Sequence, residues 1–320
     1  MLILSLSLIC GGSACRDDKR KLSSGKQKIQ VIASLFPLYD FARHIGGEKA
    51  EVLLLLPPGT EAHSFEPAPH DVIRIHEADI FIYTGMNLEP WVGEILKGAA
   101  NKRIIIVDSS KGIGGSRFHL SGSENPLNDH EERDFESGEY GSAYGDPHIW
   151  LDFVFAQTMI DTICESFIRT DPSGEVFYVR NANKLKQTLT QLDTSYRAML
   201  SGCRKNVIIH GGHSAFFYLA DRYGLTYLPV YPSFAPDAEP TLQDLIGLIE
   251  KLRAHNLKHV FYEELITPKV AGTISRETGA RLLLLHGAHN ISREDYDQGV
   301  TFVSLMERNL ENLRKGLECT

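Results

Sequence analysis

The sequence predicts an α/β protein with two similar parallel-sheet lobes joined by one long rigid helix. Short apolar segments rich in β-branched residues alternate with helical segments in residues 28–110, and the alternation returns after residue 203. This alternation is typical of βα units around a mostly parallel sheet. Between the two regions, residues 176–201 contain neither proline nor glycine, which favours a helix about 40 Å long. Two lobes joined in this way predict a cleft for a small ligand.

The first lobe is predicted at residues 28–172. Its apolar runs predict strands at residues 29–35, 50–57, 78–85 and 102–110. Helices are predicted between them at residues 39–47, 70–78 and 88–99. Residues 109–147 have no apolar period, so we expect a mobile loop there, with its acidic part at 116–146. A strong helical pattern follows at 149–170.

The linking helix is predicted at residues 173–202, and the second lobe at 203–320. Strands are predicted in this lobe at residues 205–210, 225–231, 257–264 and 280–286. Helices are predicted at residues 214–224, 241–256 and 268–279, and one long final helix at 295–318.

The N-terminus has the layout of a lipoprotein signal peptide. An apolar stretch at residues 2–10 is followed by small residues and by Cys15. We expect residues 1–15 to be the signal peptide, Cys15 to become lipidated, and residues 16–27 to act as a tether. The alternative is a buried N-terminal strand. Export would place the three remaining cysteines in an oxidising compartment, where two could pair. Their spacing does not decide the pairing among Cys164, Cys203 and Cys319.

Composition and missing motifs exclude several classes of function. The net charge of −8 argues against nucleic acid as the main partner. No run of 18 apolar residues occurs, so no membrane-spanning helix is predicted. The chain lacks GxSxG, HExxH and P-loop motifs, and without CxxC it has no thiolate zinc finger. We therefore predict a protein that is not an enzyme.

Histidines follow several of the predicted strands. His63, His213 and the pair His286 and His289 each come shortly after an apolar run, and His148 lies where the acidic loop meets a helix. Ligands of open α/β sheets bind at the carboxyl ends of strands, so these segments can converge. Neutral imidazole is a favoured ligand of Zn²⁺. Any one of these histidines could instead have a capping or surface role.

Both lobes and the joining helix resemble the metal-binding solute receptors of ABC transporters, in particular zinc receptors of the ZnuA type. The resemblance rests on VIASLFPLYDFARHIGG, LLPPGTEAHSFEPAPHDVIRIHEADIFIYTGMNLEPWV, DPHIWLD, HSAFFYLADRYGL and LMERNLENLRKGL. It implies a single metal site between the lobes, with His63, His148 and His213 as ligands. The family usually has an aspartate in a turn after the last strand, and here that turn reads LHGAHN. The resemblance implies His286 as the fourth ligand, and His289 is the rival.

These observations predict an extracytoplasmic, periplasmic or cell-surface receptor that captures Zn²⁺ between its lobes and delivers it to an ABC permease. The receptor is expected to act as a monomer, and a lipid on Cys15 would anchor it. The first alternative is a manganese or iron receptor of the same type. A secreted zinc hydrolase would need an open coordination position and a general base. A surface adhesin is the third alternative.

Overall fold

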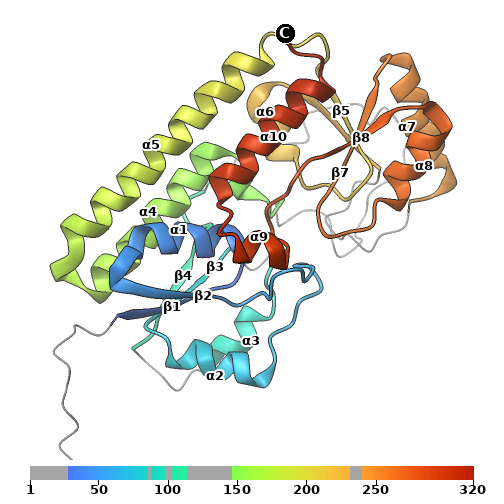
Figure 1. Ribbon diagram of the computed structural model, residues 1–320. Coiled ribbons are helices and arrows are strands. Elements are labelled where there is room, and N and C mark those ends of the chain that lie inside the picture. Colours follow the sequence, from blue (N-terminus) through green and yellow to red (C-terminus); the bar gives the residue numbers. More distant parts are fainter. Residues whose placement is uncertain (1–27, 86–87, 98–102, 114–145, 231–239) are drawn as a thin grey trace, which may run out of the picture.

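The computed structural model describes residues 28–85, 88–97, 103–113, 146–230 and 240–320. Figure 1 shows two α/β lobes with one long helix running along both. The predicted signal peptide, the tether, Cys15 and nearly all of the acidic loop lie outside the described residues. In the described part of the chain, no helix is both long and apolar enough to cross a membrane.

The N-terminal lobe is built on a four-stranded parallel sheet in the order β2-β1-β3-β4. Its strands are β1 (Ile29–Ala33), β2 (Ala50–Leu54), β3 (Ile80–Tyr83) and β4 (Ile105–Asp108). In the register, Val31 lies opposite Val52 on one side and Ile80 on the other. The helices of this lobe are α1 (Phe36–Gly46), α2 (Pro69–Glu77), α3 (Val92–Lys97) and α4 (Phe153–Thr170), with 3₁₀ turns η1 (Gly47–Lys49), η2 (Ile149–Leu151) and η3 (Pro172–Gly174).

The C-terminal lobe repeats this topology, with strand order β6-β5-β7-β8. Its strands are β5 (Val207–His210), β6 (Thr226–Pro229), β7 (His259–Tyr262) and β8 (Arg281–Leu284), all parallel. Its helices are α6 (Phe217–Tyr223), α7 (Leu242–Ala254), α8 (Lys269–Thr278), α9 (Arg293–Asp297) and α10 (Phe302–Gly316). The predicted pair of similar parallel-sheet lobes is confirmed.

Helix α5 (Glu175–Leu200) connects the lobes and is 26 residues long. It packs along α4, α1 and α10. Its buried positions recur every three to four residues, which is the spacing of one helix face: Tyr178, Ala182, Leu185, Leu189, Leu192 and Tyr196. Tyr196 also donates a hydrogen bond to the carbonyl of Met306 in α10 at 2.6 Å. One face of the helix is therefore packed against both lobes rather than exposed to solvent.

Buried polar contacts join the two lobes. Asp40 in α1 is fully buried, and its Oδ2 accepts a hydrogen bond from the backbone N–H of Phe302 at 2.9 Å. Arg222 of α6 lies 2.8 Å from Asp193 of α5 and 3.1 Å from Asp152, the N-cap of α4. Large side chains of both lobes share one hydrophobic core, among them Phe41, Trp150, Phe167, Tyr196, Phe216 and Phe302.

The expectation of one long C-terminal helix at 295–318 is wrong. Helix α9 ends at Asp297, and Gly299 adopts a left-handed φ of 70° that a continuing helix cannot accommodate. Thr301 then caps α10, because its side chain accepts a hydrogen bond from the N–H of Ser304 at 3.2 Å. The break lets α9 lie across the junction of the lobes (Figure 1).

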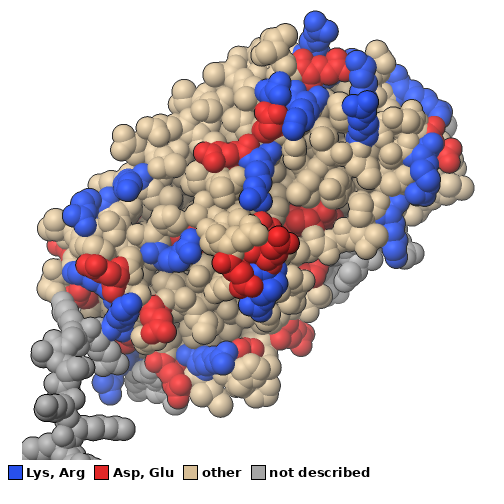
Figure 2. Space-filling model, viewed as in Figure 1, with Lys and Arg blue, Asp and Glu red and all other residues tan. Residues whose placement is uncertain are grey.

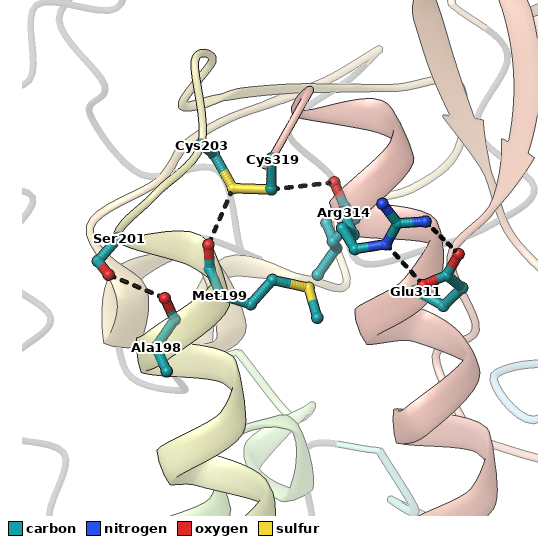
Figure 3. The surroundings of a disulfide bond; sticks show 8 residues. Ala198, Met199, Ser201, Cys203, Glu311, Arg314 and Cys319 are labelled. Carbon is teal, nitrogen blue, oxygen red and sulfur yellow. Dashed lines mark hydrogen bonds and ion pairs between the residues drawn. A yellow bond between two sulfur atoms is a disulfide. The ribbon is translucent and has the colours of Figure 1, made fainter.

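The structure resolves the open question of the cysteines. Cys203 and Cys319 form a disulfide, and Cys164 is a free, buried thiol. The disulfide joins the segment after α5 to the segment after α10, and an isolated β-bridge pairs the same two residues (Figure 3). It therefore fastens the C-terminus of the chain to the end of the linking helix.

Charged side chains of both signs are interspersed over the face in Figure 2. Several form local pairs, such as Arg308 with Asp295 at 3.2 Å and Arg314 with Glu311 at 2.8 Å. Exposed pairs of this kind contribute little to stability.

Candidate metal centre

Strand ends and loops of both lobes bring four histidines together. His63 lies in the loop after β2, and His148 directly precedes η2. His213 follows β5, and His289 lies in the turn after β8. His148, His213 and His289 are buried and His63 is half-buried. Each lobe thus contributes two imidazoles to one group.

The four rings are arranged at the corners of a tetrahedron. One ligand atom from each lies within 4.8 Å of the corresponding atoms of the other three. All six ring-to-ring distances fall between 4.7 and 5.4 Å. The Nε2 atoms of His63 and His148 are 3.4 Å apart. Nitrogens bound tetrahedrally to one Zn²⁺ at the usual bond length are about 3.3–3.4 Å apart, so the spacing of this pair matches a single zinc ion.

The expectation that His286 completes this group is corrected, because the structure places His289 there. The chain turns after β8 through Ala288, which has a φ of 59°. Nδ1 of His286 accepts a hydrogen bond from the N–H of Ala288 at 3.0 Å, and the backbone of His286 is paired on both sides with the Asn309 side chain. His286 therefore stabilises the turn that presents His289. The structure does bring together the other three predicted residues, His63, His148 and His213.

Two ring nitrogens in the group are buried with neither a hydrogen-bond nor an ion-pair partner among the described residues. They are Nε2 of His213 and Nε2 of His289. Buried polar atoms are nearly always paired, so unpaired ones indicate a ligand. A cation bound by the four imidazoles would satisfy both nitrogens.

A carboxylate lies behind three of the four histidines. Nδ1 of His148 lies 2.5 Å from Asp146, and Nδ1 of His213 lies 2.5 Å from Glu263. Nδ1 of His289 lies 3.3 Å from Glu264. A carboxylate on Nδ1 fixes the ring so that Nε2 faces the metal, which is common behind metal-binding histidines. These acids were not predicted from the sequence, although Asp146 stands two residues before His148 and the Glu pair directly follows an apolar strand.

Burial keeps two of the four histidine rings neutral. Burial, reinforced by the nearby rings of His289 and His213, lowers the pKa of His63 to about 2. Burial likewise lowers the pKa of His148 well below its usual range. Neutral imidazole is the form that binds a metal ion. The two histidines are therefore ready to bind at physiological pH.

The two glutamates behind the site remain ionised. Burial acts to raise the pKa of Glu264, but His286, His289 and the N–H of Gly287 outweigh it and hold that pKa well below its usual range. Burial also acts to raise the pKa of Glu263, but contact with His213 outweighs it and lowers the pKa. The site thus combines the neutral rings of His63 and His148 with two negatively charged carboxylates that contact the other two rings.

A small cavity lies beside the histidine group, with a volume of about 20 Å³. His213, His289 and both glutamates line it, and the rest of its wall is formed by Thr60 to Ala62, Leu265, Ile266 and Asn290. A water molecule needs about 10–15 Å³ by this measure, whereas sites for organic ligands are far larger. The cavity suits an ion with its water better than an organic substrate.

The donor set determines what the site can do chemically. If all four nitrogens bound one ion, they would close a tetrahedral shell and leave no position for the activated water that a zinc hydrolase requires. Nitrogen ligands also favour Zn²⁺ over Mn²⁺, because manganese prefers oxygen donors. The arrangement is suited to holding a divalent ion.

Comparisons with known proteins identify the family of this chain. The family model described as zinc-uptake complex component A, periplasmic, matches residues 31–316. The high-affinity zinc uptake system protein ZnuA of Bacillus subtilis is 33% identical over 308 residues, which cover 96% of this chain and 92% of that protein. Zinc-binding AdcA of Streptococcus pyogenes is 29% identical, and the match covers 98% of this chain but only 61% of AdcA.

Two solved structures are similar over the length of both lobes. The metal-dependent lipoprotein YcdH of B. subtilis has a TM-score of 0.74 and 31% identity, covering 91% of this chain and 99% of that one. The Zn(II)-bound ZnuA-like domain of Streptococcus pneumoniae AdcA has a TM-score of 0.72 and 28% identity, with the same coverage of 91% and 99%.

Proposed function

The chain belongs to the family of the periplasmic zinc-uptake component ZnuA, and from this premise we propose that it is an extracytoplasmic receptor that captures Zn²⁺ between its lobes and delivers it to an ABC permease for import. Zn²⁺ is here the cargo rather than a resident cofactor. The process requires binding and release, with no covalent chemistry.

The group of four imidazoles carries this proposal. His63, His148, His213 and His289 lie at the corners of a tetrahedron, and the 3.4 Å between Nε2 of His63 and Nε2 of His148 fits one zinc ion. Two unpaired, buried ring nitrogens and three carboxylates behind the rings support metal binding by these residues. Because the ligands come from both lobes, the bound ion would bridge them. Release would then accompany a change in the contact between the lobes.

The receptor is proposed to act at the outer face of the membrane as a monomer, with Cys15 as the site of a lipid anchor. Support for the anchor comes from the N-terminal sequence and from the description of the similar YcdH as a lipoprotein. An anchored receptor would stay close to the permease that accepts its zinc.

Two measurements test the proposal. Metal-stripped protein is titrated with Zn²⁺ and then with Mn²⁺ in competition, and one tight zinc site per chain is expected. Zinc uptake is then measured in vesicles that contain the partner permease, with and without the receptor. If zinc binds no more tightly than manganese, the cargo is wrong. If binding is tight but the receptor does not stimulate uptake, the delivery role is wrong.

A further inference from the structure

Two consecutive carboxylates after β7 each contact a different histidine of the metal centre. Glu263 lies 2.5 Å from Nδ1 of His213, and Glu264 lies 3.3 Å from Nδ1 of His289. In an extended strand, neighbouring side chains point to opposite faces. Directing both acids to one site therefore requires the chain to turn at this point.

A turn with an unusual backbone directly follows these two acids. The N–H of Ile266 donates to the carbonyl of Glu264 at 2.8 Å, which closes a three-residue γ-turn around Leu265. Leu265 has a φ of 61°, a left-handed value that is rare for a residue with a branched side chain. γ-turns with this positive φ are strained, and such strain is typically found at functional sites.

The turn after β8 accommodates the carboxylate of Glu264. The N–H of Gly287 donates to Oε2 of Glu264 at 2.7 Å. A Cβ atom on Gly287 would lie only 2.5 Å from the ring of His289, so only glycine fits there without displacing that ring. Glu264 is itself buried among these groups, and Oε1 is also 3.4 Å from Nδ1 of His286. Both carboxylate oxygens of Glu264 accept hydrogen bonds, which is the arrangement expected of an ionised carboxylate.

We propose that Glu264 is the positioning residue of His289, the fourth ligand. It orients the ring of His289 and, through that ring, adds negative charge that four neutral imidazoles do not have. This inference rests on the proposed function, because it concerns the affinity of the same zinc site. A carboxylate on Nδ1 makes the ring a better donor at Nε2 and holds it in the binding orientation. Loss of such a partner typically weakens metal affinity by about 10–100-fold.

A double-mutant cycle tests this role. Glu264→Gln keeps the size of the side chain and removes its charge, and it is made both with His289 and in a His289→Asp background. With His289 present, we expect Zn²⁺ affinity to fall about 10–100-fold. An aspartate ligand brings its own charge and has no N–H for Glu264 to accept, so the same change should then have a much smaller effect or strengthen binding. Glu250→Gln, an exposed acid on α7, is the matched control and should leave affinity unchanged.

The outcomes separate this inference from the proposed function. A similar loss of Zn²⁺ affinity in both backgrounds would show that Glu264 only supports the fold. No loss of affinity with His289 present would show that Glu264 does not act on the ligand. Either result overturns the inference. If Glu264→Gln does not fold, Glu264→Asp keeps the charge with a shorter reach and is taken through the same cycle. If the unmodified protein itself lacks a tight zinc site, the proposed function fails instead.

Discussion

The side-chain amide of Asn290 donates a hydrogen bond to the backbone carbonyl of Pro57 at 2.7 Å. A second bond from the same nitrogen reaches the carbonyl of Thr60 at 2.9 Å. Asn290 directly follows His289, and the 57–60 segment leads into His63. One fully buried amide thus ties the loops that carry a histidine of each lobe. A backbone bond from Gly59 to the carbonyl of Ile291 at 2.8 Å reinforces the tie.

These hydrogen bonds predict that Asn290→Ala reduces both the stability of the protein and its affinity for zinc. Two backbone carbonyls would lose a hydrogen bond from this amide, although the carbonyl of Pro57 would keep the N–H of Thr60 at 3.0 Å. Each lost hydrogen bond typically costs about 0.5–1.5 kcal/mol of stability. We expect a lower urea midpoint for the metal-free protein and a zinc affinity reduced about tenfold, because about 1.4 kcal/mol corresponds to that factor. Gln298→Ala, which removes an exposed amide after α9, is the control. Equal behaviour of the two variants would argue against the tie.

Zinc binding should change the overall shape of the protein very little. The loop contacts of Asn290, the Asp40 bond to Phe302 and the shared hydrophobic core already hold the lobes together. Hinge closure needs a flexible connection, and α5 is packed against both lobes. Small-angle scattering with and without Zn²⁺ should therefore give nearly the same radius of gyration. A large compaction on adding zinc would contradict this expectation.

His289→Ala should weaken zinc binding far more than His286→Ala. His289 belongs to the tetrahedral group, whereas Nδ1 of His286 accepts a hydrogen bond within its own turn. We expect a loss of at least about 100-fold for His289→Ala, since three protein nitrogens would remain, and a smaller loss for His286→Ala. Competition with a chelator of known affinity measures both. The opposite ranking would restore His286 as the ligand.

The metal-free protein should lose stability as the pH falls below about 6.5, the ordinary histidine pKa. The pKa of His63 is lowered to about 2, so an unfolded chain binds a proton there that the folded protein does not. Stability then rises with pH across the window from about 2 to 6.5 and is lost on acidification. His63→Gln should lose less stability than the unmodified protein between pH 7 and pH 4.5. Urea unfolding at both pH values tests this, with exposed His70→Gln as the control; parallel curves would count against it.

Removing the disulfide should reduce stability and leave zinc affinity intact. Cys203 and Cys319 are 116 residues apart, and native disulfides typically contribute about 2–5 kcal/mol. The double variant Cys203→Ser with Cys319→Ser avoids leaving a free thiol. Its urea midpoint should fall, while its zinc titration should match that of the unmodified protein, because the bridge joins the ends of two helices rather than loops that carry ligands. A weakened zinc site would show that the bridge acts on the metal centre.

Periodicity and strand-end position were enough to predict much of this protein. Apolar runs are local properties of the chain, so the two βα lobes and the long helix between them could be read from residue spacing. His63 and His213 follow strands, and the rule that ligands lie at the carboxyl ends of parallel strands indicated that they meet. The resemblance to metal receptors implied that these two and His148 are ligands of one metal ion.

Only the tertiary structure decided the remaining features, because each depends on contacts between residues distant in the chain or on the rotation of a few backbone bonds. Whether His286 or His289 enters the metal centre depends on the turn at Ala288 and on Asn309, which holds the backbone of His286. The pairing of Cys203 with Cys319 depends on how α5 and α10 pack. The role of Glu264 could not be predicted from its position after an apolar strand, because residue spacing does not reveal which way a buried carboxylate points.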